Sequence, residues 1–345
     1  MARYEQYEGG LEDFWERRGA KSRFEREEYL FGRAVRFASN EADVLTAVEH
    51  ILPLYSQLPA TQRQPLAVQL VVQMSRVPAG AVPDDLMQQI TYTGDKEWLM
   101  WQLNGWGQVH VDLATGQATA VITPELAQRL DLVAHCLLNT ILLNFFIAQG
   151  FAMLHASCLV QKERALLLMA PHNTGKSTTA LRLLWAGYQL VSDSMVFVVP
   201  DEERLVGFPV GKIKLRADMV PQFPQLHPFL NTEAVRNETK YTLDLRQFDS
   251  ALVRETAVTT QQLSLCLLAR HEGQETLVTA VSPKQRQEAV IHNSLYYDTP
   301  QVWRRNLAQL ELVLAKAAVH HLTIGTNPEK IVEAVASLWA QNSNG

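Results

Sequence analysis

The amino-acid sequence predicts a protein of mixed α/β and α+β class with two domains. We place a smaller α+β domain at residues 1–150 and a larger α/β domain at residues 151–345. A chain of 345 residues is long enough for about two domains. Hydrophobic residues make up 47% of it and charged residues 19%, which is typical of a folded globular protein. Short strand-and-turn patterns dominate the first part, whereas apolar runs alternate with helical spacing in the second.

The elements of the first domain follow from apolar spacing and from turn-forming residues. Val44, Leu45 and Val48 recur at helical intervals, Asn104 and Gly105 favour a hairpin turn, and Pro124 suits the first turn of a helix. In chain order we expect a strand at 29–37, a helix within 41–58, a strand at 66–74, strands and turns over 89–122, and a helix from 124 to about 150. The most apolar part of that last helix, 136–148, is too short to span a bilayer, so we interpret it as buried.

The second domain is expected to begin with a hairpin and a loop that opens a helix. The hairpin covers 152–169, and the helix starts near residue 175. Further strands are expected at 189–199, 212–215, 241–245, 262–269, 276–281 and 319–324, an irregular proline-containing excursion at 209–228, and helices at 285–292, 302–316 and 328–338.

Charge and cysteine content exclude several classes of protein. The 31 Lys and Arg residues against 36 Asp and Glu residues give a formal charge of −5, which argues against a dedicated nucleic-acid-binding protein. Three widely spaced cysteines form neither a disulfide framework nor a zinc motif, which fits a reducing cytoplasm. The first thirty residues are charged and aromatic and lack the apolar region of a signal peptide, so we expect a short amphipathic helix or docking arm there.

A glycine-containing loop between an apolar run and an amphipathic helix is the main functional motif. The sequence LLLMAPHNTGKSTTALRLLWAG places Gly175, Lys176, Ser177 and Thr178 at the start of the helix. Backbone amides at such a helix start bind phosphate oxygens, and the helix dipole favours negative charge there. We therefore predict a phosphate-binding loop, with Lys176 on the β- and γ-phosphates of ATP and the Ser177 hydroxyl on Mg²⁺.

The loop departs from the usual G-x-x-x-x-G-K-[ST] pattern because Ala170 occupies the first glycine position. Asn173 and Thr174 precede the remaining glycine. Asn tolerates a left-handed backbone better than other non-glycine residues, so we predict a positive φ at Asn173. The alternative is an ordinary strand-to-helix turn capped by Asn173 or Thr174, with no phosphate site.

Two further side chains lie near this loop in the sequence. Asp193 is the single carboxylate in the apolar run YQLVSDSMVFV, and such an acid beside a phosphate loop suits Mg²⁺ or a proton-accepting role. An Asx turn is the alternative. His155 precedes the hairpin in the sequence LHAS; a lone histidine beside an apolar strand is more often a core residue.

The order His-Ala-Ser, hairpin, GKST loop and LVSD resembles the C-terminal kinase domain of HPr kinase/phosphorylase. It is similar above all to the HPr-kinase-like enzymes of small bacterial gene clusters, some of which phosphorylate peptides. This resemblance implies a P-loop kinase domain of HPr-kinase/PEP-carboxykinase type with a mixed sheet. It also implies that Asp193 accepts the proton of the substrate hydroxyl, that Ser177 and Asp193 hold the metal, and that His155 lies near this acid.

The resemblance has limits that bear on activity. Ser194 stands where HPr kinase has a second acid, and the acidic motif of the reverse reaction has no clear counterpart, so a kinase is implied without phosphorylase activity. Family members often carry basic residues downstream that approach phosphates. Arg216 and Lys240 are our candidates for that role, with a solvated charged face as the alternative.

The sequence thus favours ATP- and Mg²⁺-dependent transfer of the γ-phosphoryl group to a hydroxyl, such as a Ser of a small protein or peptide. Two alternatives remain open: a nucleotide-binding scaffold with a degenerate site, and a small-molecule kinase. We expect a cytoplasmic protein that binds neither nucleic acid nor a membrane. A homo-oligomer is an open alternative to a monomer.

Overall fold

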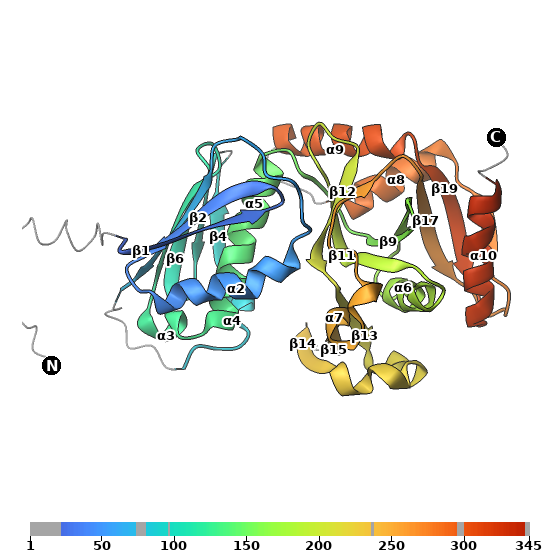
Figure 1. Ribbon diagram of the computed structural model, residues 1–345, viewed down its shortest axis with the longest axis horizontal. Coiled ribbons are helices and arrows are strands. Elements are labelled where there is room, and N and C mark those ends of the chain that lie inside the picture. Colours follow the sequence, from blue (N-terminus) through green and yellow to red (C-terminus); the bar gives the residue numbers. More distant parts are fainter. Residues whose placement is uncertain (1–21, 74–80, 96, 236–237, 295–299, 342–345) are drawn as a thin grey trace, which may run out of the picture. The chain divides into compact units, whose positions relative to one another are not determined.

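The structure is a computed structural model that describes residues 22–73, 81–95, 97–235, 238–294 and 300–341 (Figure 1). The docking arm expected at the N-terminus lies largely outside the described residues. The described residues form two compact units. The first holds 22–29, 33–51 and 60–145, and the second holds 30–32, 52–59 and the described residues from 146 onward. The chain crosses between the units several times, and the last crossing lies between Phe145 and Phe146, a few residues before the boundary predicted near Gly150.

The first unit is built on a seven-stranded mixed sheet in the order β1-β2-β3-β7-β6-β5-β4. β2 pairs in parallel with β3, and β3 with β7, whereas β7, β6, β5 and β4 form antiparallel pairs. Alternate residues such as Val68 and Leu70 are buried, so one face of the sheet packs into a core. The strands are β1 (Phe24–Leu30), β2 (Arg33–Ser39), β3 (Leu66–Val72), β4 (Thr91–Gly94), β5 (Trp98–Gln102), β6 (Gly107–Asp112) and β7 (Gln117–Ile122).

The helices of the first 150 residues are short except near the end. They are η1 (Asp43–Thr46), α2 (Ala47–Ile51), η2 (Leu52–Leu54), η3 (Leu86–Gln89), α3 (Pro124–Ala127), α4 (Leu130–Leu132), the π-helical η4 (Val133–Leu138) and α5 (Asn139–Ala148). The stretch Leu130–Ala148 is long and apolar enough to cross a membrane by length and composition, yet 67% of it is buried within the structure. Ile141 and Leu142 have no exposed surface, which confirms the predicted buried helix.

The second unit contains a mixed sheet in the order β16-β12-β11-β9-β10-β17-β19-β18, with β8 paired to β11. β10, β17 and β19 run parallel, and β9 joins β10 in the predicted antiparallel hairpin. The strands of this sheet are β8 (Ala152–Leu154), β9 (Ser157–Gln161), β10 (Arg164–Met169), β11 (Gln189–Val198), β12 (Arg204–Val210), β16 (Val258–Thr259), β17 (Leu263–Arg270), β18 (Leu277–Ala280) and β19 (Ala318–Ile324).

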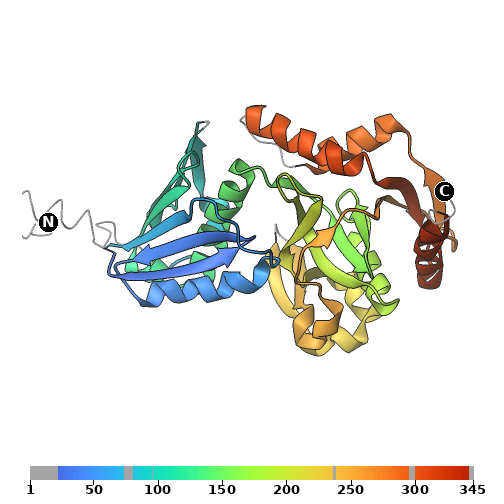
Figure 2. The same ribbon diagram turned by 45° about the horizontal axis from the view of Figure 1, so that its top comes forward.

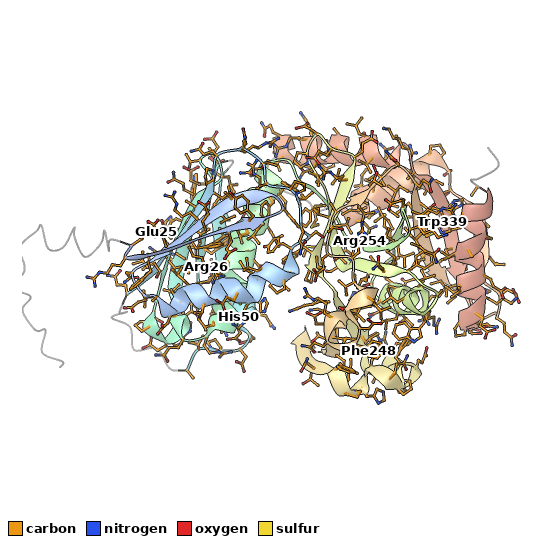
Figure 3. The ribbon with its side chains drawn as sticks, in the orientation of Figure 1. Glu25, Arg26, His50, Phe248, Arg254 and Trp339 are labelled. Atoms are coloured by element: carbon orange, nitrogen blue, oxygen red, sulfur yellow. The ribbon has the colours of Figure 1, made fainter. Side chains whose placement is uncertain are left out.

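Helices cover both faces of this sheet (Figure 2). α6 (Lys176–Trp185) and α10 (Pro328–Gln341) supply apolar residues to one core, and α8 (Pro283–Asn293) and α9 (Pro300–Leu314) supply them to the other. Trp339 of α10, labelled in Figure 3, also donates from Nε1 to the Tyr188 hydroxyl at 2.9 Å. The result is a helix–sheet–helix arrangement that buries the central strands on both faces.

A small antiparallel sheet, in the order β13-β15-β14, completes the second unit. Its strands are β13 (Lys212–Arg216), β14 (Asn231–Val235) and β15 (Glu238–Asp244). The proline-containing excursion contains β13 and two 3-10 helices, η5 (Ala217–Gln222) and η6 (Pro224–Phe229); α7 (Leu245–Phe248) and η7 (Ser250–Leu252) follow β15.

One predicted strand was wrong, and another strand was not predicted. The single strand expected at 29–37 is a hairpin of β1 and β2, because the chain turns at Phe31, which has φ 48°, and Gly32, with φ 71°. β12 was not predicted, and its last two residues, Pro209 and Val210, were included in the irregular excursion expected at 209–228. Gly207 is needed where β12 pairs with β11, since a Cβ there would lie 2.6 Å from the carbonyl oxygen of Val191.

The two N-terminal segments of the second unit belong to it through aromatic packing. The ring centroid of Phe31 lies 5.6 Å from that of Phe197, and the Tyr55 ring lies 4.8 Å from Phe208. Burial of these rings contributes to stability in proportion to their large apolar area. The second unit therefore depends on residues that precede it in the sequence.

Candidate functional site

The predicted loop lies at the carboxyl end of the parallel strands of the second unit. β10 ends at Met169 and leads into the loop, and its parallel neighbour β17 ends at Arg270. Ligands of open α/β sheets bind at this edge of the sheet. A pocket at this place is lined by His155, Ala170, Pro171, His172, Asn173, Thr174, Gly175, Lys176, Ser177, Thr178, Asp193, Ser194, Lys214, Leu215, Arg216, Asp218, Met219, Lys240 and Arg270.

The loop backbone has two left-handed residues. Asn173 has φ 63°, as predicted, and Gly175 has φ 104° immediately before α6 begins at Lys176. The Thr179 amide donates to the Gly175 carbonyl at 2.9 Å, so the first turn of the helix starts at the glycine. Successive residues of alternating backbone hand turn their amides inward and form a concave anion site. The amides from Asn173 to Ser177 are therefore the candidates for such a site.

Asp193 lies on an irregular part of β11. The pairing of β11 with β9 shifts register between Leu190 and Ser192, and its pairing with β12 shifts between Ser192 and Met195. Such bulges redirect side chains and are frequent beside functional sites. Here the bulge lies at the carboxylate, which lines the pocket although the residue is only 6% exposed.

Two serine hydroxyls hold the two oxygens of this carboxylate. Ser157 Oγ donates to Asp193 Oδ1 at 2.5 Å, and Ser177 Oγ donates to Oδ2 at 2.6 Å. Burial raises the pKa of Asp193, and the Lys176 charge, the two hydroxyls and a backbone hydrogen bond with Lys214 oppose that shift. An acid with a raised pKa is better suited to receive a proton than an ordinary surface carboxylate.

Lys176 and His155 contact each other. The lysine Nζ donates to His155 Nε2 at 3.0 Å, so this ring nitrogen carries no proton. Burial and the neighbouring lysine charge lower the pKa of His155 to about 4, although part of the ring is exposed. Burial also lowers the pKa of Lys176, while Asp193 opposes that change. His155 thus acts here as a neutral acceptor beside the lysine.

The cations on the far side of the loop differ in their partners. Arg216 donates from Nε and a terminal nitrogen to the two carboxylate oxygens of Asp218, at 3.0 and 3.1 Å. Lys240 lies opposite Arg216 in the pairing of β15 with β13. Arg270 is exposed, and a Cβ built on Gly175 would lie 4.0 Å from its Nε.

The structure brings all the residues predicted from the sequence to one pocket, from His155 and Ala170 through the loop to Arg216 and Lys240. Sequence reasoning did not assign Ser157, Lys214 or Arg270. Ser157 was visible in the His-Ala-Ser motif, and Arg270 was visible as the lone cation that ends an apolar strand. The roles of all these residues remain predictions.

The groups present fit Mg²⁺ and a polyphosphate. Ser177 and Asp193 place a hydroxyl and a carboxylate oxygen side by side, which is a hard oxygen pair of the kind Mg²⁺ prefers. Among the described residues there is no group of three or more His, Cys, Asp or Glu side chains that could hold a metal ion. Mg²⁺ commonly takes most of its ligands from phosphate oxygens and water, so two protein ligands suffice.

Comparison of the chain with known protein families and with curated proteins finds no match. Among solved structures, the Hpr(Ser) kinase/phosphatase from Coxiella burnetii is similar, with 15% sequence identity and a TM-score of 0.28. The match covers 56% of this chain and 94% of that chain.

Proposed function

We propose that the protein binds a nucleoside triphosphate, such as ATP, with Mg²⁺ and transfers its γ-phosphoryl group to a hydroxyl acceptor. The observation that carries this proposal is the hydrogen bond of 2.6 Å between Ser177 of the loop and Asp193 of β11. It joins the first turn of the phosphate loop to the one buried carboxylate of the pocket, which is the pairing that phosphoryl transfer requires.

Each residue has a distinct part in this reaction. The amides from Asn173 to Ser177 bind phosphate oxygens, and Lys176 exchanges its contact with His155 for the β- and γ-phosphates. Ser177 and Asp193 hold Mg²⁺, which supplies positive charge to the phosphate oxygens when it is bound.

The transfer itself is a displacement at phosphorus. The bond between the acceptor oxygen and the γ-phosphorus forms while the bond from that phosphorus to the β–γ bridging oxygen breaks. Asp193 accepts the hydroxyl proton, and ADP leaves with the electron pair of the broken bond. Most of the catalysis is positioning and charge stabilisation, for which the amide-rich, cationic pocket is suited.

Calorimetry with Mg·ATP tests the binding step. Lys176→Met should lower ATP affinity at least about tenfold, the loss expected for a charged hydrogen bond to phosphate. Lys284→Met is a matched control, because Lys284 is 86% exposed on α8 and lies outside the lining of the pocket. Equal affinity of the Lys176 variant and the wild type would contradict the phosphate-loop assignment.

Release of ADP in the presence of free alcohols, serine-containing peptides and small proteins tests the transfer step. A second function, nucleotide binding without turnover, is favoured by Ser194, which lines the pocket where the resemblance implies a second acid. Tight ATP binding with no ADP release from any acceptor would support that function over a kinase.

A further inference from the structure

The pocket contains an arginine that sequence reasoning did not assign. Arg270 is the last residue of β17, and β17 pairs in parallel with β10 with Met169 opposite Leu267. Because parallel strands end at the same edge of a sheet, this pairing carries Arg270 to the level of the loop that follows Met169. Both the loop and Arg270 line the same pocket.

The guanidinium lies close to the loop backbone. The position of a Cβ on Gly175 is 4.0 Å from Arg270 Nε, which is the nearest described atom outside Gly175 and its chain neighbours. Gly175 has φ 104° and immediately precedes the first turn of α6, whose amides belong to the proposed phosphate site. A guanidinium at this distance can reach an oxygen of a phosphate held by those amides, since its planar fork donates two hydrogen bonds to such groups.

Arg270 also differs from the other arginines nearby. Arg216 directs Nε and one terminal nitrogen to the carboxylate of Asp218, and Arg182 donates to Gln222 at 2.8 Å. Within the described part of the chain, Arg270 has neither a hydrogen bond nor an ion pair. Its charge instead lowers the pKa of Arg182, although burial lowers that pKa more. An uncompensated cation beside an anion site is available to a ligand at no cost in broken contacts.

We infer that Arg270, rather than Arg216, is the catalytic arginine that donates to the transferring phosphoryl group. This inference rests on the proposed function. As the acceptor–phosphorus bond forms and the bond to the bridging oxygen breaks, charge on the equatorial oxygens is stabilised by the Arg270 fork. Asp193 still takes the hydroxyl proton, and Arg270 neither gains nor loses one, because its guanidinium stays protonated throughout.

Binding of a transition-state mimic tests this assignment without knowledge of the acceptor. ADP affinity is measured by calorimetry with Mg²⁺ alone and with Mg²⁺ plus aluminium fluoride, which occupies the place of the transferring group. In Arg270→Gln the affinity for ADP alone should stay within about threefold of the wild type, and the gain on adding fluoride should fall at least about tenfold. Arg270→Lys should retain part of the gain, since it keeps the charge and loses the fork.

Two further variants separate this role from general charge. Arg304→Gln removes an exposed arginine of α9 outside the lining of the pocket and should leave the fluoride gain unchanged. Arg216→Gln should reduce the gain less than Arg270→Gln. The inference would be overturned, while the proposed function stands, if aluminium fluoride increased the ADP affinity of Arg270→Gln as much as that of the wild type. It would also be overturned if Arg216→Gln lost as much of this increase as Arg270→Gln. Absence of ADP binding in the wild type would overturn both.

Discussion

Asn173 allows the geometry of the loop to be tested through its backbone alone. Its φ of 63° is left-handed, its side chain is exposed, and the described residues offer it no side-chain hydrogen bond. A substitution here therefore changes the cost of the left-handed backbone and little else. That cost is about 1–2 kcal/mol for an ordinary L residue, smaller for Asn and absent for Gly.

Asn173→Val should consequently lose about 1–2 kcal/mol, because a β-branched residue is especially disfavoured at positive φ. If the loop keeps its conformation, the free energy of unfolding decreases by this amount. If the loop relaxes, it must be re-formed around the phosphates, and ATP affinity falls about tenfold for each 1.4 kcal/mol. The two losses should together account for the whole cost.

Asn173→Gly is the matched variant. Relief of left-handed strain and the greater freedom of glycine in the unfolded chain oppose each other. The free energies of unfolding and of ATP binding should therefore both stay within about 0.5 kcal/mol of the wild type. Urea unfolding and calorimetry with Mg·ATP measure the two parts. A valine variant as stable and as tight in ATP binding as the wild type would refute the reasoning.

Three other substitutions test the remaining contacts of the site. Lys176→Met removes the positive charge beside His155 and should raise the pKa of that histidine from about 4, followed by NMR titration; an unchanged pKa would mean that burial alone sets it. Asp193→Asn should keep ATP binding but lower turnover at least about a hundredfold, and normal turnover would make Asp193 structural. Ser157→Ala should lower the free energy of unfolding by about 1–3 kcal/mol, because Asp193 Oδ1 loses its donor. Ser264→Ala is its control, a fully buried serine whose Oγ has no partner among the described residues; equal losses in urea unfolding would show that Asp193 gains nothing from Ser157.

The elements that carry the site could be predicted because their signals are local. The apolar run, the loop and α6 follow one another in a single stretch of sequence, and the left-handed tendency of Asn173 is a property of that residue type. The turn at Phe31 could not be predicted, since phenylalanine at φ 48° is not a turn signal. The need for Gly207 could not be predicted either. A glycine in the sequence of a strand suggests that the strand ends, unless the strand that pairs with it is known.

The other features that the sequence did not predict depend on contacts between segments far apart in the chain. Ser157 and Asp193 are 36 residues apart, and only the pairing of β9 with β11 brings them together. Arg270 lies near the loop because β17 is the parallel neighbour of β10, an order of strands that no local pattern contains. By contrast, the pairing of Arg216 with Asp218, two residues along the chain, was visible in the sequence and weakens the role first expected for this arginine.

The two departures from the family pattern have different physical consequences. Ala170 is 7% exposed and packs in the core with Leu168 and Leu181, and its backbone is not left-handed. The conformations that require special residues occur later in the loop, at Asn173 and Gly175. An alanine directly after β10 therefore does not affect the two left-handed positions of the loop. A missing second acid is the more serious change, because it leaves Asp193 to serve both Mg²⁺ and the acceptor proton. The two oxygens of this carboxylate have separate hydroxyl donors: Ser177 donates to Oδ2 and Ser157 donates to Oδ1. On the proposed function, the site therefore has one buried carboxylate, Asp193, with two hydroxyl donors, where the resemblance implies two acids.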